Sequence, residues 1–223
     1  MIRLAIFDCD GTLVDSGATI HKALTLALAA HGRVVPPPRA ARRVIGLSLF
    51  EAMEHLVPDA PADELTAMAE TYRRSFQGLR GAGQVEEPLF DGIAELIDAL
   101  ASDGWSLAVA TGKSDRGLAH CLDRHGLAGR FVSLQTADRH PSKPHPAMAL
   151  AAMAEAGASA ANSVMIGDTG WDMGCARGAG IGAIGVGWGY HDAAELMAEG
   201  AHCVAQEPAD VLRLACHWVE RGA

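Results

Sequence analysis

The chain has 223 residues, of which 49% are hydrophobic and 20% charged, and its formal net charge at pH 7 is −9. This length can bury a full hydrophobic core in one or two domains. The negative charge argues against nucleic acid or an anionic membrane surface as a general partner. The sequence shows no signal peptide and no run of about 18 apolar residues that would span a membrane, so we expect a cytoplasmic protein.

The cysteines and histidines indicate neither disulfides nor zinc. The five cysteines include no pair with CxxC spacing, and an odd number of scattered thiols is typical of free cysteines in a reducing compartment. His140 and His145 flank a proline-rich loop, but two histidines without a third ligand make a weak zinc site.

The first part of the chain reads as one strand followed by helices. The mostly apolar run 2–7 predicts a strand that is buried on both faces. We then predict a helix over 17–31 that Ser16 caps and Gly32 ends, a short helix over 39–45 after a proline connector, another helix to about Leu56, and a long one from Asp63 to about Gly78. Glycines at 78, 81 and 83 indicate a linker after it.

Strands and helices alternate in the rest of the chain. We predict helices over 91–103, 115–125, 145–156, 171–179, 192–199 and 208–220, and strands over 105–110, 131–134, 163–166, 181–186 and 202–204. This alternation predicts an α/β fold, a doubly wound, Rossmann-like parallel sheet. The expected domains are an α/β core over 1–14 and 86–223 and an all-helical insertion over 15–85.

Two carboxylates follow the first predicted strand. Asp8 and Asp10 are two positions apart, so both side chains leave the strand on the same side, at the sheet edge where open α/β sheets bind ligands. Close carboxylates tend to take separate roles, one as nucleophile or cation ligand and the other as acid and base. Gly11 permits a sharp turn and Thr12 adds a hydroxyl. The alternative is an ordinary strand-ending turn.

Two further predicted strand ends carry groups that suit an anion. Thr111-Gly112-Lys113-Ser114 offers a hydroxyl and backbone N–H groups just before a helix, although simple helix capping by Ser114 or Thr111 explains it equally well. Lys143 precedes Pro144, which we expect in the first turn of a helix. A lysine at that positive helix end requires a nearby anion, unless it is an ordinary surface lysine.

A last pair of carboxylates follows the predicted strand 163–166. Asp168 should emerge at the same edge as Asp8, and Asp172 lies one helical turn later. Carboxylate oxygens without clustered thiols suit Mg²⁺, whereas the alternative is a capped helix start. Together the strand ends would supply a nucleophile, an acid and base, a lysine and a metal site, which is the equipment for phosphoryl transfer.

Four motifs, in this order and spacing, resemble those of the haloacid dehalogenase superfamily, in its phosphoglycolate phosphatase-like branch. The motifs are Asp8–Asp15, Thr111-Gly112-Lys113, Lys143-Pro144 and Gly167–Asp172. The resemblance covers nearly the whole chain, and it implies that the helical insertion is a cap domain over the core.

The resemblance implies a mechanism for the carboxylates. Asp8 would attack phosphorus and form an aspartyl-phosphate, and Asp10 would protonate the leaving oxygen and then activate water. Mg²⁺ would be held by the Asp8 carboxylate, the Asp10 backbone carbonyl and Asp168, with Asp172 supporting the metal site. Asp10 also separates the chain from the true dehalogenases, which lack an acid/base aspartate at that position.

The resemblance also implies the substrate contacts. Thr111, Gly112 and Lys143 would hold the phosphoryl oxygens, and Thr12 and Lys113 are further candidate substrate-binding residues.

In the cap, the matching stretch is Arg42–Ser48, where Arg43 and Ser48 are candidate contacts to the leaving group. An arginine there would favour a substrate with a second anionic group, such as the carboxylate of phosphoglycolate. The alternative is that Arg42 and Arg43 are ordinary solvated helix residues.

The function that we expect is Mg²⁺-dependent hydrolysis of a small phosphate monoester, either phosphoglycolate-like or a sugar phosphate, by a monomer or homodimer. A mutase of the β-phosphoglucomutase type shares all four motifs and stays open, as does pyrophosphate hydrolysis. Phosphonate hydrolysis also stays open but is less favoured, because a phosphonatase would need a Schiff-base lysine from the cap and the only lysine of the cap is Lys22, early in its first helix. A non-catalytic binding protein is the least favoured reading, because every motif carboxylate is present.

Overall fold

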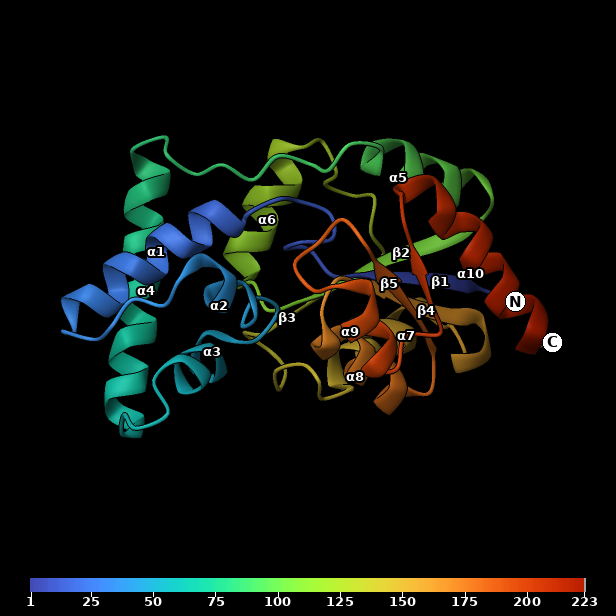
Figure 1. The fold of residues 1–223 in the computed structure, drawn as a ribbon. Helices are drawn as coiled ribbons and strands as arrows, with labels where there is room; N and C mark the ends of the chain where they lie inside the picture. Colours follow the sequence, from blue (N-terminus) through green and yellow to red (C-terminus); the bar gives the residue numbers. More distant parts are fainter. Residues whose placement is uncertain (223) are drawn as a thin grey trace.

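A computed structural model describes residues 1–222, and its centre is a six-stranded parallel sheet (Figure 1). The strand order is β3-β2-β1-β4-β5-β6. The strands are β1 (Arg3–Phe7), β2 (Trp105–Thr111), β3 (Ser133–Thr136), β4 (Ser163–Gly167), β5 (Gly182–Val186) and β6 (Cys203–Ala205). The chain thus winds outward from β1 in both directions, which confirms the predicted doubly wound fold.

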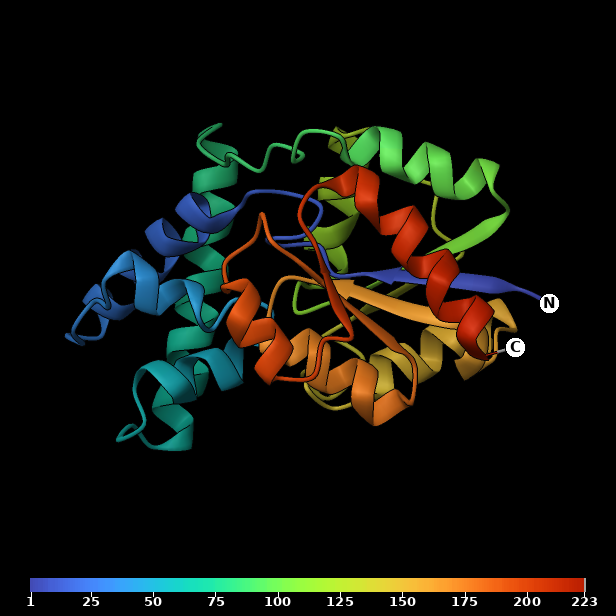
Figure 2. The same cartoon turned by 45° about the vertical axis from the view of Figure 1, so that its right-hand side comes forward.

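Helices cover both faces of the sheet. The helices of this part are α5 (Ile93–Ser102), α6 (Asp115–Arg124), α7 (Ala147–Ala156), α8 (Gly170–Ala179), α9 (Ala193–Ala198) and α10 (Pro208–Gly222), with a 3₁₀ turn η1 (Ala160–Asn162) before β4. Figure 2 shows α5 and α10 on one side of the strands and the α7–α9 group on the other. None of the helices within residues 1–222 is long and apolar enough to cross a membrane.

Alternating side chains of β1 join the two apolar layers. Ala5 and Phe7 pack in the cluster that contains residues of α5, α6 and α10, whereas Leu4 and Ile6 pack in the cluster that contains residues of α7 and α8. All four side chains are fully buried. This is why the first strand has no polar alternation, since both of its faces are covered.

The four remaining helices lie beside the sheet. They are α1 (Gly17–Ala30), α2 (Pro38–Arg42), α3 (Leu49–Leu56) and α4 (Ala62–Gly81), on the left in Figures 1 and 2. They share an apolar cluster of their own, in which Leu24 and Leu28 of α1 meet Met68 and Tyr72 of α4. We refer to this group as the cap; its boundaries at residues 15 and 85 stay a prediction.

The structure corrects several local predictions. Helix α4 continues through Gly78 to Gly81, so these glycines are not a linker; a glycine inside a helix costs only about 1 kcal/mol, which tertiary packing can offset. Helix α7 begins at Ala147, and Pro144 lies in the turn before it, where His145 N donates to Ser142 O. The third strand is displaced by two residues from the predicted 131–134, and α2 ends at Arg42 rather than at residue 45.

Candidate active site

The strand ends meet as the sequence predicts. Phe7 is opposite both Val109 of β2 and Ile166 of β4 in the parallel register. Asp8, the next residue, donates its backbone N–H to Ile166 O at 2.9 Å. The residues that follow these three neighbouring strands therefore face one crevice at the carboxyl edge of the sheet.

Three carboxylates share this crevice. Asp8, Asp168 and Asp172 are fully buried, and one oxygen from each lies within 4.8 Å of the others. Apart from the ion pair of Oδ1 with Lys143, the oxygens of Asp8 have no hydrogen-bond partner among the described residues. A buried carboxylate without such partners is costly, and three carboxylate oxygens are the donor set that a hard divalent cation prefers. The residues present thus fit Mg²⁺.

The pKa shifts in the crevice report the same crowding. Burial raises the pKa of Asp8 from 3.8 to about 7, against the opposing influence of Lys143. Burial also raises the pKa of Asp168 well above its ordinary value, and the negative charges of Asp172 and Asp8 raise it further. Because a cation would favour the ionised forms, it would reverse both shifts.

Lys143 is the cation that contacts this cluster in the structure. Its Nζ lies 2.9 Å from Asp8 Oδ1 and 2.6 Å from Asp172 Oδ1, and it also donates to Ala110 O. The side chain is fully buried. Burial alone would lower the pKa of Lys143, but Asp172 and Asp8 outweigh it and raise that pKa above its ordinary value. The expected anion partner of this lysine is therefore a pair of carboxylates.

Asp168 is held by groups from two loops. The Thr12 hydroxyl donates to Oδ1 at 3.0 Å, and the Tyr190 backbone N–H donates to Oδ2 at 2.9 Å. A Cβ on Gly189 would lie 2.1 Å from the Asp168 Cβ, so only glycine fits there. Thr12 thus positions Asp168, and its expected role as a substrate contact stays a prediction.

Asp172 is anchored within its own helix as well as by Lys143. Its Oδ2 accepts hydrogen bonds from the Thr169 backbone N–H at 3.0 Å and from the Thr169 hydroxyl at 2.7 Å. The two residues form the capping box of α8. The structure confirms the capping interpretation of Asp172, and the metal-site interpretation stays a prediction that is compatible with it, because the capping box fixes the carboxylate beside the crevice.

Asp10 takes part in a separate set of contacts. Lys113 Nζ lies 2.8 Å from Asp10 Oδ1 and 2.6 Å from Glu87 Oε1, and the Ser16 hydroxyl also donates to Asp10. Sequence reasoning took Lys113 for a substrate contact and Ser16 for a helix cap. The structure pairs Lys113 with Asp10, and Ser16 makes no side-chain cap of α1. Glu87, which is almost completely buried, has no motif that could have signalled its role.

Comparison with known proteins identifies the family that carries this arrangement. The sequence matches the haloacid dehalogenase-like hydrolase family over residues 5–186. The chain belongs to this family. A Dickeya dadantii relative named "Probable phosphatase IndB" is 39% identical over 201 residues, 89% of this chain and 86% of the relative. A phosphoglycolate phosphatase from Agrobacterium fabrum is 32% identical over 197 residues, 85% of this chain and 82% of the relative.

Solved structures agree with this assignment. A hydrolase from Pseudomonas syringae superposes with a TM-score of 0.85 at 26% identity, covering 96% of this chain and 98% of that chain. The resemblance inferred from the four motifs is thereby confirmed, and the chain is an enzyme of the hydrolase class.

In this hydrolase the loop between α2 and α3 packs closely against Gly112, at the carboxyl end of β2. A Cβ on Gly112 would lie 2.4 Å from Leu47 O and 2.8 Å from Gly46 O, so glycine permits the contact. The Ser48 backbone N–H donates to Ser142 Oγ at 2.8 Å, which ties the loop to the core. The Ser48 hydroxyl caps α3 by accepting from Glu51 N.

Two other candidate cap residues lie away from the crevice. Arg43, an expected substrate contact, pairs with Glu195 at 2.8 Å and its side chain is 63% exposed. The guanidinium thus contacts α9 of the α/β part and not the crevice, and the peptide carbonyl also contacts that part, since Trp171 Nε1 donates to Arg43 O at 3.1 Å. Lys22 donates to Gln84 at 2.8 Å, and neither Arg43 nor Lys22 lines the cavity described next.

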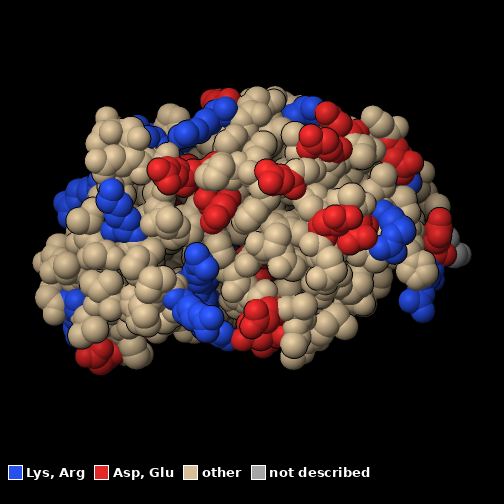
Figure 3. All heavy atoms as spheres, turned by 45° about the horizontal axis from the view of Figure 1, so that its top comes forward, with Lys and Arg blue, Asp and Glu red and all other residues tan. Residues whose placement is uncertain are grey.

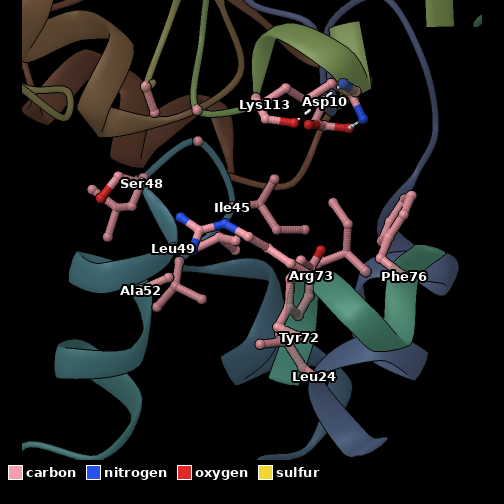
Figure 4. Close-up of a pocket in the computed structure, with 18 of the residues that line it drawn as sticks. Asp10, Leu24, Ile45, Ser48, Leu49, Ala52, Tyr72, Arg73, Phe76 and Lys113 are labelled. Carbon is pink, nitrogen blue, oxygen red and sulfur yellow. Dashed lines mark hydrogen bonds and ion pairs between the residues drawn. The ribbon is translucent and has the colours of Figure 1, made fainter. Parts of the chain in front are cut away.

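A cavity of about 540 Å³ opens between the cap and the core. Asp10 and Lys113 lie at its core end, and Leu24 and Tyr72 lie opposite them on the cap helices (Figure 4). Gly112 and Ser48 also line it. Gly46 also lines it, and a Cβ on Gly46 would lie 3.8 Å from Lys143 Nζ, so the cavity adjoins the crevice of the carboxylates.

Proposed function

We propose that this hydrolase is a Mg²⁺-dependent phosphatase that cleaves a phosphate monoester, such as phosphoglycolate or a sugar phosphate, through an aspartyl-phosphate on Asp8. The observation that carries the proposal is the fully buried Asp8 carboxylate, which forms an ion pair with Lys143, has no other polar partner among the described residues and lies beside two further carboxylates. The relatives named as phosphatases support the same reaction class.

In the first step an oxygen of Asp8 attacks phosphorus, and the bond from phosphorus to the leaving oxygen breaks. Lys143, within 3 Å of Asp8, stabilises negative charge on the phosphoryl oxygens. Asp10 gives a proton to the leaving oxygen. In the second step water attacks the phosphorus of the aspartyl-phosphate while Asp10 takes a proton from that water. The bond between phosphorus and the Asp8 oxygen breaks, so phosphate is released and Asp8 becomes a carboxylate again.

The carboxylates of Asp8 and Asp168 would hold Mg²⁺, with Asp172 in support. When bound, the metal would neutralise charge on the phosphoryl group and favour the ionised form of Asp8. Thr12 and the Tyr190 N–H keep Asp168 in position, as groups around metal ligands do in other enzymes.

The test is phosphate release from a panel of small phosphate esters and pyrophosphate, with Mg²⁺ and with chelator, by the wild type and by Asp8→Asn. We expect Mg²⁺-dependent release from monoesters that falls at least about 10³-fold in Asp8→Asn, because the nucleophile is lost. A sugar phosphate converted to its isomer without phosphate release would instead indicate a mutase, and release only from pyrophosphate would contradict monoester hydrolysis.

A further inference from the structure

The cavity between the cap and the core is larger than a two-carbon leaving group needs. Its volume of about 540 Å³ falls in the range of about 300–1,000 Å³ that is typical of pockets for ligands of drug size. A glycolate group would leave most of this space to water. The dimensions of the cavity therefore favour a leaving group with a larger body.

The cap side of the cavity is apolar and partly aromatic. Leu24 and Ile45 line it and are almost completely buried. Tyr72 and Phe76, one turn apart on α4, also line it, with their ring centroids 6.0 Å apart and their planes tilted by 38°. Such a wall gains free energy by covering an apolar or aromatic body and offers little to a small polar alcohol.

Arginines give the same cavity an anion-binding character. Its basic lining residues are Arg73, Arg80, Lys113 and Arg116, and its acidic ones are Asp10 and Asp138. This positive balance contrasts with the net charge of −9 on the whole chain. Lys113 is already paired with Asp10 and Glu87, and Arg80 lies beside Glu87 and the Phe76 ring.

Among the described residues that line the cavity, Arg73 and Arg116 are the two arginines without an ion pair to a buried carboxylate. Arg73 reaches from α4 across the cavity toward Ile45 and Ser48 (Figure 4). Its only ion pair among the described residues is with Glu70 on the same helix, and both side chains are largely exposed, so that pair is weak. Arg116 of α6 forms no ion pair with any described residue.

We infer that the leaving group of the substrate is a ring-sized, largely apolar alcohol that carries a second anionic group. Tyr72 and Phe76 cover its ring, and Arg73 with Arg116 binds its anion. The inference rests on the proposed phosphatase function and narrows its substrate class. It transfers the anion-binding role that the sequence suggested for Arg43 to other arginines.

The test compares four esters as substrates: benzyl phosphate, 4-carbamoylbenzyl phosphate, 4-carboxybenzyl phosphate and phosphoglycolate. The carbamoyl and carboxyl esters have nearly the same shape and differ in charge. We expect kcat/KM to be highest for the carboxybenzyl ester, at least about tenfold above its carbamoyl counterpart, because a charged hydrogen bond is stronger than a neutral one. Phosphoglycolate should rank below all three benzyl esters.

Single-residue variants test whether Arg73 and Arg116 cause the preference for the carboxyl ester. Arg73→Ala and Arg116→Ala should each lower the ratio of the carboxyl to the carbamoyl ester by several-fold. Arg74→Ala should leave the ratio unchanged, since Arg74 is the neighbour of Arg73 on α4, donates to Thr71 and does not line the cavity. In Asp8→Asn, calorimetric binding of 4-carboxybenzyl phosphate should weaken about tenfold when Arg73→Ala is added.

The outcomes separate this inference from the proposed function. Phosphate release with phosphoglycolate as the preferred substrate, or equal kcat/KM for the carboxyl and carbamoyl esters, would overturn the inference and leave the phosphatase proposal standing. An unchanged ratio in both Arg73→Ala and Arg116→Ala would overturn the assignment of those residues. No phosphate release from any of the four esters would contradict the phosphatase proposal itself.

Discussion

Three buried carboxylates at the strand ends repel one another, and a bound cation would reduce this repulsion. Asp8, Asp168 and Asp172 are fully buried within one crevice, and the one cation in contact with them among residues 1–222 is Lys143. Like charges in a buried site cannot all ionise without a large cost. This imbalance governs how the protein responds to pH and to metal.

The stability of the metal-free protein should therefore fall as the pH rises from 5.5 to 7. The pKa of Asp8 is about 7 in the folded chain and 3.8 as the ordinary value, so between these values the folded state holds a proton that the unfolded state has released. The free energy of unfolding should drop by about 1.5 kcal/mol across that interval from this group.

The measurement is urea unfolding in chelator at both pH values, for the wild type and Asp8→Asn. Because Asn does not ionise, the stability difference between the two proteins should change with pH by that amount. Parallel pH dependences for the two proteins would show that Asp8 does not hold a proton in the folded state.

Thr12→Val tests the support of the metal site. Valine keeps the shape of threonine but removes the hydroxyl that donates to Asp168 at 3.0 Å. Loss of such a contact behind a metal ligand weakens metal affinity by about 10–100-fold, so the Kd for Mg²⁺ in calorimetry should rise by at least about tenfold. Thr12→Ser is the matched control and should bind Mg²⁺ like the wild type. Equal Mg²⁺ affinity in Thr12→Val would remove Thr12 from the site.

At the scale of elements, the loop between α2 and α3 can contact the end of β2 only because residue 112 is a glycine. Gly112→Ala would place a Cβ 2.4 Å from Leu47 O, and backbone atoms cannot yield as a flexible side chain can. We expect the loop to be pushed off the core and kcat/KM to fall by at least about 100-fold, because misplacement of about 1 Å at a site costs that much.

Gly78→Ala is the control for the same substitution in open space, since nothing lies within 4 Å of a Cβ there. It should leave kcat/KM unchanged and raise the free energy of unfolding by about 0.5–1 kcal/mol, as expected for alanine in a helix. Wild-type kcat/KM in Gly112→Ala would mean that the loop does not need this close approach.

The elements also show where sequence patterns suffice. The burial of β1 on both faces and the alternation of strands and helices predicted the sheet, and the sheet predicted that Asp8 and Asp168 would meet. Sequence patterns gave a wrong prediction where one residue type suits two different local structures. Ser16 precedes a helix as a cap would, but its hydroxyl donates to Asp10, and this choice depends on a partner that the helix pattern does not contain.

For the whole molecule, the unpredicted contacts join segments that are distant in sequence. The Arg43–Glu195 pair and the hydrogen bond from Tyr190 N to Asp168 both depend on how the cap and the last loops close around the strand ends. No spacing rule relates such segments.

The α/β part and the cap also differ in surface charge. On the face in Figure 3, most acidic side chains lie over the middle and right of the molecule.

The most direct test of the account is whether Asp8 carries the phosphoryl group. Wild type, Asp8→Asn and Asp10→Asn would be mixed with p-nitrophenyl phosphate and Mg²⁺, quenched in acid and analysed by peptide mass spectrometry. We predict one phosphoryl group on the peptide containing Asp8 in the wild type, more of it in Asp10→Asn because water is no longer activated, and none in Asp8→Asn. Phosphate release without any label on that peptide, and undiminished in Asp8→Asn, would contradict the account.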